Sequence, residues 1–284
     1  TPSSSAAAVT SAPASSVVSS SAVASATSTP SSSSGSAKRG LVYNTFSLIS
    51  EFSASVSIGW MYNWAQTPGG TIPSTLEYVP QLWGLRTAYD TPDWKSNAEE
   101  QISLGSTHLM GYNEPDVEDG AGGSFLSATE AAEGWMTYMQ PFAGKAKLVS
   151  PGVCNGEGVR PATGRNQGLD WLEDFVSACS SCTIDKINVH WYASYTGMGS
   201  DMETVVSYFK EYMEKAYKKF NKPLWVTEFE LQGLDGVEGA DEIEAKFIKE
   251  IDTYVASTAW IERYSYFKTE TIVTKTALKT AYIS

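Results

Sequence analysis

The chain has 284 residues and a formal net charge of −12, with 32 acidic residues against 20 basic ones. This charge argues against a nucleic-acid-binding protein, because binding to nucleic acid needs a basic surface. It also disfavours binding to anionic membranes. No uninterrupted apolar run approaches the roughly 18 residues that a membrane-spanning helix needs. We therefore expect neither nucleic acid nor a membrane as a partner.

Residues 1–37 differ in composition from the rest of the chain. Ser and Thr occupy 20 of these 37 positions, and none of the 37 residues before Lys38 is charged. Such a segment buries too little apolar surface to fold, and Ser and Thr mixed with Pro are typical of an O-glycosylated stalk. An unmodified disordered tail is the alternative. Either reading predicts a spacer in a secreted protein, extracellular or attached to a cell wall, and Thr1 in place of an initiator Met predicts that a leader has been removed.

Residues 38–284 have the size of one barrel domain. They number 247, close to the ~250 that are typical of a (β/α)₈ barrel. Lys38 and Arg39 at the border could form a dibasic processing site, but we expect them simply to open the first strand. Eight strands are predicted in chain order, at residues 40–44, 57–63, 78–84, 108–113, 147–153, 186–192, 223–228 and 263–267.

Helical patterns lie between most of these strands. Ser127 and Glu130 have the spacing of a capping box, which predicts a helix that runs to about Phe142. Three apolar stripes predict further helices: Leu169, Leu172, Phe175 and Val176; Val205, Phe209, Tyr212 and Phe220; and Ile243, Phe247, Ile251 and Tyr254. Residues 65–77, rich in Pro and Gly, predict a loop. A doubly wound sheet would give the same alternation, but its glycine-rich phosphate loop is missing. The α/β fold favoured is a single-domain (β/α)₈ TIM barrel.

Two glutamates end short apolar runs with strand character. Glu114 ends the run HLMGYNE and Glu228 ends the run KPLWVTE. A carboxylate at the end of a buried strand costs free energy unless it is paired or used. Two of them, on the fourth and seventh strands, predict a paired acid and nucleophile at the C-terminal face of the barrel. The alternatives are an ordinary turn around Glu114 and a buried salt bridge from Glu228 to Arg86 or Arg263.

The neighbours of both glutamates carry expectations of their own. Asn113 is predicted to hydrogen-bond a sugar hydroxyl beside the reacting carbon. Pro115 favours an extended backbone at Glu114. Alternation along the seventh strand puts Val226 and Glu228 on one face. If Val226 faces the barrel interior, Glu228 therefore lies at the top of that interior.

The two histidines have different expected roles. His190 and Tyr192 share a face of the sixth strand, so both could hydrogen-bond the nucleophile or the substrate. A satisfied core histidine is the alternative for His190. His108 stands at the opposite end of its strand and is predicted to be structural. Two histidines so far apart leave no zinc-binding spacing, and we expect neither a metal nor a cofactor.

Aromatic residues make up 12% of the chain, which fits a cleft for neutral ligands. Sugar rings stack on aromatic faces, and seven aromatic residues lie near predicted strand ends: Tyr43, Trp60, Tyr62, Trp64, Trp83, Trp191 and Tyr266. Half of them are expected to be core or surface packing. The predicted substrate contacts are Tyr43, Asn63, Trp83 and Tyr266, together with Asn113, His190 and Tyr192.

The three cysteines predict one local disulfide and one free thiol. Cys179 and Cys182 follow a predicted helix and precede a strand, whereas thioredoxin-like redox pairs open a helix. A disulfide in a secreted protein is therefore favoured for this pair. Cys154 is then left over as a free, buried thiol.

Several of these motifs together resemble glycoside hydrolase family 128. That family includes fungal endo-β-1,3-glucanases, and the alkali-sensitive linkage proteins of fungal cell walls are similar to it. The motifs are RGLVYN at 39–44, PQLWG at 80–84, GYNEPD at 111–116, LVSP at 148–151, the CxxC pair at 179–182, the strand at 185–192 and WVTEF at 225–229. The resemblance spans residues 38 to about 284.

The resemblance implies roles for the two glutamates. Glu114 would be the acid/base and Glu228 the nucleophile of a retaining double displacement, with the carboxyl groups about 5–5.5 Å apart. The last strand of the family usually ends with a Trp that forms a sugar platform, and this chain departs by offering Tyr266 there.

The predicted protein is a secreted, monomeric, retaining endo-β-1,3-glucanase that acts on β-1,3-glucan polysaccharide or oligosaccharides. One alternative is a catalytically weak cell-wall protein that binds glucan. The other is a retaining hydrolase of the same clan that acts on another β-glycan.

Overall fold

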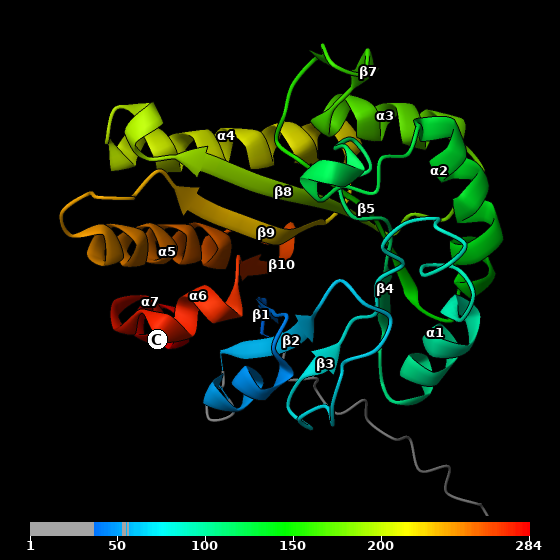
Figure 1. Cartoon of the computed structure of the whole chain (residues 1–284), viewed down its shortest axis with the longest axis horizontal. Helices are drawn as coiled ribbons and strands as arrows, with labels where there is room; N and C mark the ends of the chain where they lie inside the picture. Colours follow the sequence, from blue (N-terminus) through cyan, green and yellow to red (C-terminus); the bar gives the residue numbers. More distant parts are fainter. Residues whose placement is uncertain (1–36, 53–54, 56) are drawn as a thin grey trace, which may run out of the picture. The chain divides into compact units, whose positions relative to one another are not determined.

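Eight strands form one parallel sheet in a computed structural model that describes residues 37–52, 55 and 57–284 (Figure 1). The order across the sheet is β3-β2-β1-β10-β9-β8-β5-β4. These strands are β1 (Arg39–Val42), β2 (Ile58–Tyr62), β3 (Glu77–Tyr78), β4 (His108–Met110), β5 (Lys147–Val153), β8 (Lys186–Ser194), β9 (Leu224–Gln232) and β10 (Ile261–Tyr266). The expected stalk lies outside the described residues, except for Ala37.

The two end strands of this sheet meet and close it. Gln81, just after β3, forms a parallel bridge with Met110 of β4. The Met110 amide donates to the Pro80 carbonyl at 3.0 Å, and the Leu82 amide donates to the Met110 carbonyl at 3.0 Å. The third predicted strand is nevertheless much shorter than expected, because Pro80 has no N–H to continue a ladder. Closure of eight parallel strands confirms the predicted (β/α)₈ barrel.

The helices lie outside the sheet (Figure 1). They are α1 (Trp94–Ser103), α2 (Ala128–Gly134), α3 (Gly168–Ala178), α4 (Met202–Phe220), α5 (Ala240–Ser257), α6 (Thr269–Thr274) and α7 (Thr276–Ile283). The predicted capping box opens α2, and the helix continues through a π turn and a 3₁₀ turn to Phe142. A small hairpin of β6 (Val159–Arg160) and β7 (Arg165–Asn166) follows β5 and was not expected. Among the described residues, no helix is both long and apolar enough to cross a membrane.

Strand side chains alternate between two apolar clusters. The inner cluster takes residues from strands and strand ends alone: Val42, Trp60, Tyr62, Val79, Met110, Val149 and Trp225. The outer cluster combines the alternate strand residues with the helices, and it buries the central residues of the predicted stripes, Phe175, Phe209 and Phe247. This division decides which strand-end residues reach the barrel interior.

A charged group closes the end of the barrel where the strands begin. Glu77 bonds Arg263 and also His108, whose Nδ1 lies 3.2 Å from Glu77 Oε1. The Arg263 guanidinium lies over the Trp225 ring at 4.5 Å, and the His108 ring centroid is 4.7 Å from that of Trp225. The structural role predicted for His108 is therefore confirmed.

Two further predictions concern covalent and terminal features of the barrel. Cys179 and Cys182 form a disulfide between α3 and β8, as predicted. Arg39 is the first residue of β1. Lys38 Nζ donates at 2.9 Å to the carbonyls of Val255 and Thr258 at the end of α5. Both basic residues thus serve the start of the barrel.

Candidate active site

Glu114 lies in the turn that follows β4, held by its backbone. Its amide donates to the Gly152 carbonyl at 2.8 Å, and its carbonyl accepts from the Val117 amide at 2.9 Å. The residue has φ of 38°, in the left-handed range. The extended backbone expected from Pro115 is therefore wrong at this position. A non-glycine residue in this range carries conformational strain, which is often found at functional sites.

Glu228 reaches the barrel interior through a bulge in β9. Val189 of β8 pairs with Val226, whereas the next residue, His190, pairs with Glu228, so Thr227 is one extra residue. Val226 packs in the outer cluster, so the condition under which simple alternation would place Glu228 at the top of the interior is not met. Because a bulge interrupts the alternation of faces, Thr227 and Glu228 both turn toward the neighbouring strands' polar side chains.

The carbonyl that this bulge leaves out of the ladder is satisfied by side chains. Thr227 O accepts from the Tyr62 hydroxyl at 3.1 Å and from the Ser265 hydroxyl. A buried carbonyl without partners would be costly. The bulge is thus built into the packing of β2 and β10 on β9.

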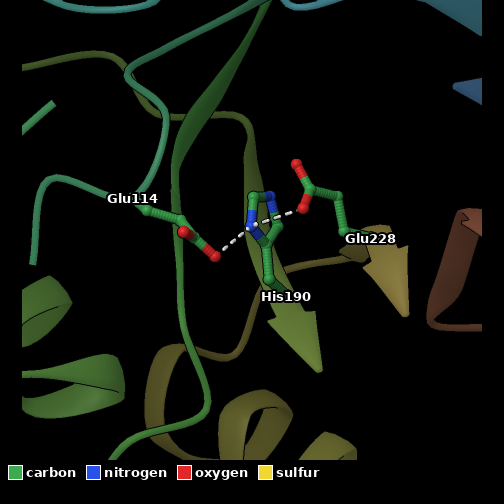
Figure 2. A group of neighbouring side chains, drawn as sticks. All are labelled: Glu114, His190 and Glu228. Atoms are coloured by element: carbon green, nitrogen blue, oxygen red, sulfur yellow. Dashed lines mark hydrogen bonds and ion pairs between the residues drawn. The ribbon is translucent and has the colours of Figure 1, made fainter. Parts of the chain in front are cut away.

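His190 lies between the two glutamates (Figure 2). Its Nδ1 is 2.9 Å from Glu114 Oε1 and 3.5 Å from Glu228 Oε2. One carboxylate oxygen of each glutamate and a ring nitrogen of His190 all lie within 4.8 Å of one another. Burial lowers the pKa of His190, but the charge of Glu228 and the hydrogen bond to Glu114 outweigh it, and the pKa is raised. The structure therefore brings the predicted pair together with a shared basic group.

Three donors surround the Glu228 carboxylate. Trp64 Nε1 donates to Oε1 at 2.7 Å, and the Tyr62 hydroxyl reaches the same oxygen at 3.3 Å. The Tyr192 hydroxyl donates to Oε2. Burial and the Glu228 charge raise the pKa of Tyr192, so this hydroxyl keeps its proton. The carboxylate is 5% exposed, and its hydrogen-bond donors here are all neutral.

The alternative of a structural salt bridge at Glu228 is wrong. Arg86 bonds Asp90, with Nε 3.0 Å from Oδ2. Arg263 bonds Glu77 at the far end of the barrel. Neither arginine is within salt-bridge distance of Glu228, so the charge on this carboxylate is not neutralised by a basic side chain other than His190.

An open cleft of about 490 Å³ lies over the two glutamates. Its lining consists of Asn44, Trp64, Trp83, Asn113, Glu114, Ala121, Gly122, Tyr192, Glu228, Gln232, Phe267 and Lys268. Trp64 and Trp83 also line a second cavity of about 380 Å³, whose lining includes Arg86 and Tyr89. The Arg86 guanidinium lies over the Trp83 ring at 4.0 Å. Two tryptophans therefore stand where the cavities meet.

Asn113 has one free acceptor at the site. Its Nδ2 donates to the Gly122 carbonyl at 3.1 Å, which ties it to the loop that edges the cleft. Its Oδ1 is buried and has no hydrogen-bond partner among the described residues. An unpaired buried acceptor is costly, and a hydroxyl of a bound ligand or a water would relieve that cost.

Three predicted substrate contacts lie elsewhere. Tyr43 is buried in the outer cluster and donates its hydroxyl to the Pro68 carbonyl at 2.8 Å. Tyr266 is also in the outer cluster and donates to Glu244 of α5. Asn63 is already paired, because its Nδ2 donates to the Thr67 carbonyl at 3.1 Å and its Oδ1 accepts from the Tyr78 hydroxyl at 2.6 Å. We correct these three predictions, because strand alternation turns both tyrosines outward.

Phe267 takes the place that was expected for Tyr266. Its ring makes edge contacts with Trp64 and Tyr192, at centroid distances of 5.8 Å and 5.7 Å. The signal that could have found it is the alternation itself, since the residue after an outward Tyr266 points inward. Lys268 and Gln232 at the rim were not predicted, and no sequence pattern marks them.

The three central groups could also be considered as metal ligands, since two carboxylates and an imidazole are common donors. The surroundings favour proton chemistry instead. Tyr62, Trp64 and Tyr192 direct donor hydrogens at Glu228, where a cation would need bare lone pairs. No second cluster of three such ligands is found in the described part of the chain.

Asp116, two residues after Glu114, connects this turn to the segments that follow β5. Its carboxylate accepts from the Cys154 thiol at 2.7 Å and from the Gly168 amide at the start of α3 at 2.8 Å. Burial and the neighbouring Asp116 raise the pKa of the Cys154 thiol well above its ordinary value. The thiol is free and partly buried, and it serves as a hydrogen-bond donor rather than as a nucleophile.

Comparison with known proteins agrees with this geometry. The sequence profile of a family described as "Glycosyl hydrolase catalytic core" matches residues 40–284. Alkali-sensitive linkage protein 1 of Schizosaccharomyces pombe is 31% identical over 239 residues, which are 82% of this chain. The chain spans only 39% of the length of that relative.

Solved structures show the same fold. A subgroup III curdlan-specific exo-β-1,3-glucanase from Blastomyces gilchristii is 35% identical, with a TM-score of 0.74 over 88% of this chain and 99% of that one. A subgroup II endo-β-1,3-glucanase from Sorangium cellulosum is 27% identical, with a TM-score of 0.68 over 87% and 98%. A subgroup I endo-β-1,3-glucanase from Amycolatopsis mediterranei, bound to laminaripentaose, is 25% identical, with a TM-score of 0.66 over 87% and 99%. This chain belongs to the glycosyl hydrolase catalytic core family, as a member of glycoside hydrolase family 128.

Proposed function

We propose that the chain is a retaining β-1,3-glucanase with Glu228 as nucleophile and Glu114 as acid/base. The observation that carries the mechanism is the short separation of the two carboxylates, whose nearest ligand oxygens lie within 4.8 Å. Retaining hydrolases hold their carboxyl groups ~5–5.5 Å apart, and inverting ones ~6.5–9.5 Å apart to admit a water. The separation supports a direct attack by one carboxylate on the sugar.

The surroundings of each glutamate support the division of roles. Glu228 accepts hydrogen bonds from Trp64, Tyr62 and Tyr192, which fix the orientation of its carboxylate for nucleophilic attack. Glu114 is 15% exposed against 5% for Glu228. Among the described residues, its side chain hydrogen-bonds one group, the His190 ring nitrogen. Because Glu114 also lines the cleft, it is placed to present a proton toward a leaving group there.

The reaction would proceed in two steps. Glu228 attacks the anomeric carbon and forms a glycosyl ester, while Glu114 protonates the departing glycosidic oxygen. Glu114, now ionised, then takes a proton from water, whose oxygen attacks the same carbon and releases Glu228 as carboxylate. The free acceptor of Asn113 would bind a hydroxyl of the sugar at the reacting position.

The substrate class is inferred from the relatives and from the cleft. The three compared enzymes are β-1,3-glucanases, and the third was solved in complex with laminaripentaose. The cleft of this chain offers Trp64, Trp83, Tyr192 and Phe267 as aromatic walls. Aromatic faces suit a neutral sugar chain, and the acidic net charge disfavours a polyanion. Endo action is the mode proposed, although the first of the three relatives is an exo enzyme.

Secretion is part of the same proposal. The Cys179–Cys182 disulfide is the kind of bond that persists in oxidising compartments. The curated relative is named as a linkage protein. We propose an extracellular or cell-wall-associated protein that acts as a monomer on β-1,3-glucan.

Product release tests this proposal. Wild type, Glu228→Gln and Glu114→Gln are incubated with a linear β-1,3-glucan, with a β-1,4-glucan as control, and reducing ends and products are measured. We expect oligosaccharides of mixed length only when wild type is incubated with the β-1,3-glucan. Glucose as the sole product would instead show exo action. Glucan that binds to wild type and releases no product would overturn the enzymatic assignment.

A further inference from the structure

The hydroxyl of Thr227, the extra residue of the β9 bulge, lies between two buried side chains of β8. Thr227 Oγ1 is 3.0 Å from His190 Nε2 and donates to Asn188 Oδ1 at 2.9 Å. Exposure is 1% for Thr227 and His190 and 0% for Asn188. Thr227 meets the imidazole at Nε2, the ring nitrogen that does not face Glu114. The role of this arrangement rests on the proposed function.

A hydroxyl carries one hydrogen, so the direction of one of its bonds decides the other. Thr227 gives its hydrogen to Asn188 Oδ1. In this orientation of the Asn188 amide, whose Nδ2 has no hydrogen-bond partner among the described residues, Thr227 can only accept at His190, and Nε2 carries the hydrogen. The backbone amide of Asn188 donates to Ser150 Oγ at 2.8 Å. This bond holds Asn188 in place as the acceptor for Thr227.

The consequence falls on the opposite ring nitrogen of His190. With Nε2–H bound to Thr227, Nδ1 faces Glu114 Oε1 at 2.9 Å and has either a lone pair or a second hydrogen. In the first case it accepts the proton of a protonated Glu114. In the second case the imidazolium donates to the Glu114 carboxylate. In both cases one proton lies between His190 Nδ1 and Glu114 Oε1.

We propose that Thr227 is a positioning residue for catalysis: by accepting His190 Nε2–H, it keeps the acid's proton on the line between His190 Nδ1 and Glu114. The proton balance is closed. A proton on Nδ1 passes to Glu114 Oε1, and from there to the departing glycosidic oxygen. In the second step Glu114 recovers a proton from the attacking water, and Thr227 and Nε2–H are unchanged throughout.

The electrostatic surroundings agree with this direction of hydrogen bonding. Burial lowers the pKa of His190, but the charges of Glu228, Glu114 and Asp116 raise it and favour a positive ring. A positive ring has hydrogens on both nitrogens. Only an accepting Thr227 is compatible with that state. If Thr227 donated to Nε2 instead, His190 could not hold the second proton.

The first test reads the histidine directly and requires no turnover. The chain has only two histidines, so long-range ¹H–¹⁵N spectra of uniformly labelled protein contain two imidazoles, and His108→Gln assigns the remaining one to His190. We expect Nε2 of His190 in wild type to be protonated throughout the pH range in which the protein is folded. A neutral His190 with hydrogen on Nδ1 alone would overturn the proposal.

The second test uses matched variants at Thr227. Thr227→Val has the same shape without the hydroxyl, and Thr227→Ser restores the hydroxyl. On β-1,3-oligosaccharides, whose leaving group needs an acid, we expect Thr227→Val to lower kcat about 10- to 100-fold, the size expected for one hydrogen bond to a charged group. Thr227→Ser is expected to stay within about threefold of wild type.

A leaving group that needs no acid separates this role from a general disturbance. With 2,4-dinitrophenyl β-laminaribioside, formation of the glycosyl–enzyme should be nearly equal in wild type and Thr227→Val, when measured as the pre-steady-state burst of phenolate. An equal loss on both substrates would show that Thr227 merely supports the structure, and the proposal would be wrong. If wild type hydrolyses neither substrate while His190 has the expected tautomer, the proposed function fails and the hydrogen-bond assignment stands.

Discussion

The indole N–H of Trp64 donates a hydrogen bond of 2.7 Å to Glu228 Oε1. Trp64 follows β2 and Glu228 lies within β9, and β1 and β10 lie between these two strands in the sheet. Trp64 has φ of 58°, in the left-handed range that non-glycine residues rarely adopt. Its ring also forms a wall of both cavities over the barrel. One residue therefore orients the carboxylate and shapes the space where a sugar would lie.

Replacing Trp64 by Phe tests the energetic value of this bond. The ring remains while the donor to a charged acceptor is lost, which costs about 1.5–3 kcal/mol. We expect kcat/KM on a β-1,3-oligosaccharide to fall roughly 10- to 100-fold. Trp191→Phe is the matched control, because the Trp191 N–H is buried without a partner among the described residues and its ring packs on the outer helices. A Trp64→Phe enzyme as active as the control would contradict the role given to this bond.

The two tyrosines near the nucleophile are expected to contribute unequally. Tyr192 donates to Glu228 Oε2, while the Tyr62 hydroxyl is 3.3 Å from Oε1 and also bonds the Thr227 carbonyl at 3.1 Å. Tyr192→Phe should lower kcat/KM about 10- to 100-fold, and Tyr62→Phe by less than about tenfold. Steady-state kinetics of both variants on one oligosaccharide provides the comparison. Equal losses, or a larger loss for Tyr62→Phe, would refute the ranking.

Gly152 leaves the room that His190 occupies. A Cβ at this position would lie 2.6 Å from His190 Nε2 and 2.8 Å from Asn188 Nδ2. Gly152→Ala should therefore displace the imidazole and lower kcat more than about tenfold, at an overpacking cost of about 1–3 kcal/mol. Gly120→Ala is the control, since a Cβ there meets nothing within 4 Å. Full activity of Gly152→Ala with an unchanged His190 spectrum would be incompatible with the packing described.

Acid should weaken the closed end of the barrel. Burial alone would raise the pKa of Glu77, but the His108 hydrogen bond and the Arg263 charge lower it from 4.5 to about 2. Because the pKa in the folded state is the lower one, the stabilisation is complete above about pH 5 and is lost as pH falls toward 2. We expect Glu77→Gln to lower the free energy of unfolding at pH 7 by about 3 kcal/mol.

Denaturant unfolding at pH 7, 5 and 3 checks this prediction. The difference between wild type and Glu77→Gln should shrink at pH 3, because the carboxyl is by then protonated in the unfolded chain. Glu157→Gln is the control, since Glu157 pairs with Lys215 at the surface and is 67% exposed, and such pairs contribute about 0–1 kcal/mol. A difference that is the same at all three pH values would show that the charge of Glu77 is not what stabilises this end.

Much of the architecture could be predicted because it depends on local patterns. Apolar runs of strand length, separated by helical stripes, predict an alternating α/β chain, and the strand around Lys147–Val153 was predicted to the residue. The two glutamates could be found because a carboxylate at the end of a buried apolar run costs free energy unless it is paired or used in catalysis. His190 and Tyr192 followed from the regular alternation of β8, which nothing interrupts before the cleft.

The remaining residues depend on contacts that no local pattern encodes. A single extra residue, Thr227, changes the faces of β9, so that Glu228 points inward although Val226 does not. The last strand has the converse problem: Tyr266 is the more polar aromatic, but its hydroxyl is taken by Glu244, and Phe267 faces the cleft. Trp64 bonds Glu228, which is 164 positions away in the sequence, and its backbone is left-handed. Neither feature is visible in a local sequence pattern.

The stereochemistry of the first product tests the central claim most directly. Wild type is mixed with a β-1,3-oligosaccharide and anomeric protons are followed by ¹H NMR from the first minutes, before the free sugar mutarotates. A double displacement through Glu228 predicts that the β-anomer of the new reducing end appears first and the α-anomer grows in later. Initial appearance of the α-anomer would mean a single displacement by water, and the assignment of Glu228 as nucleophile would be wrong.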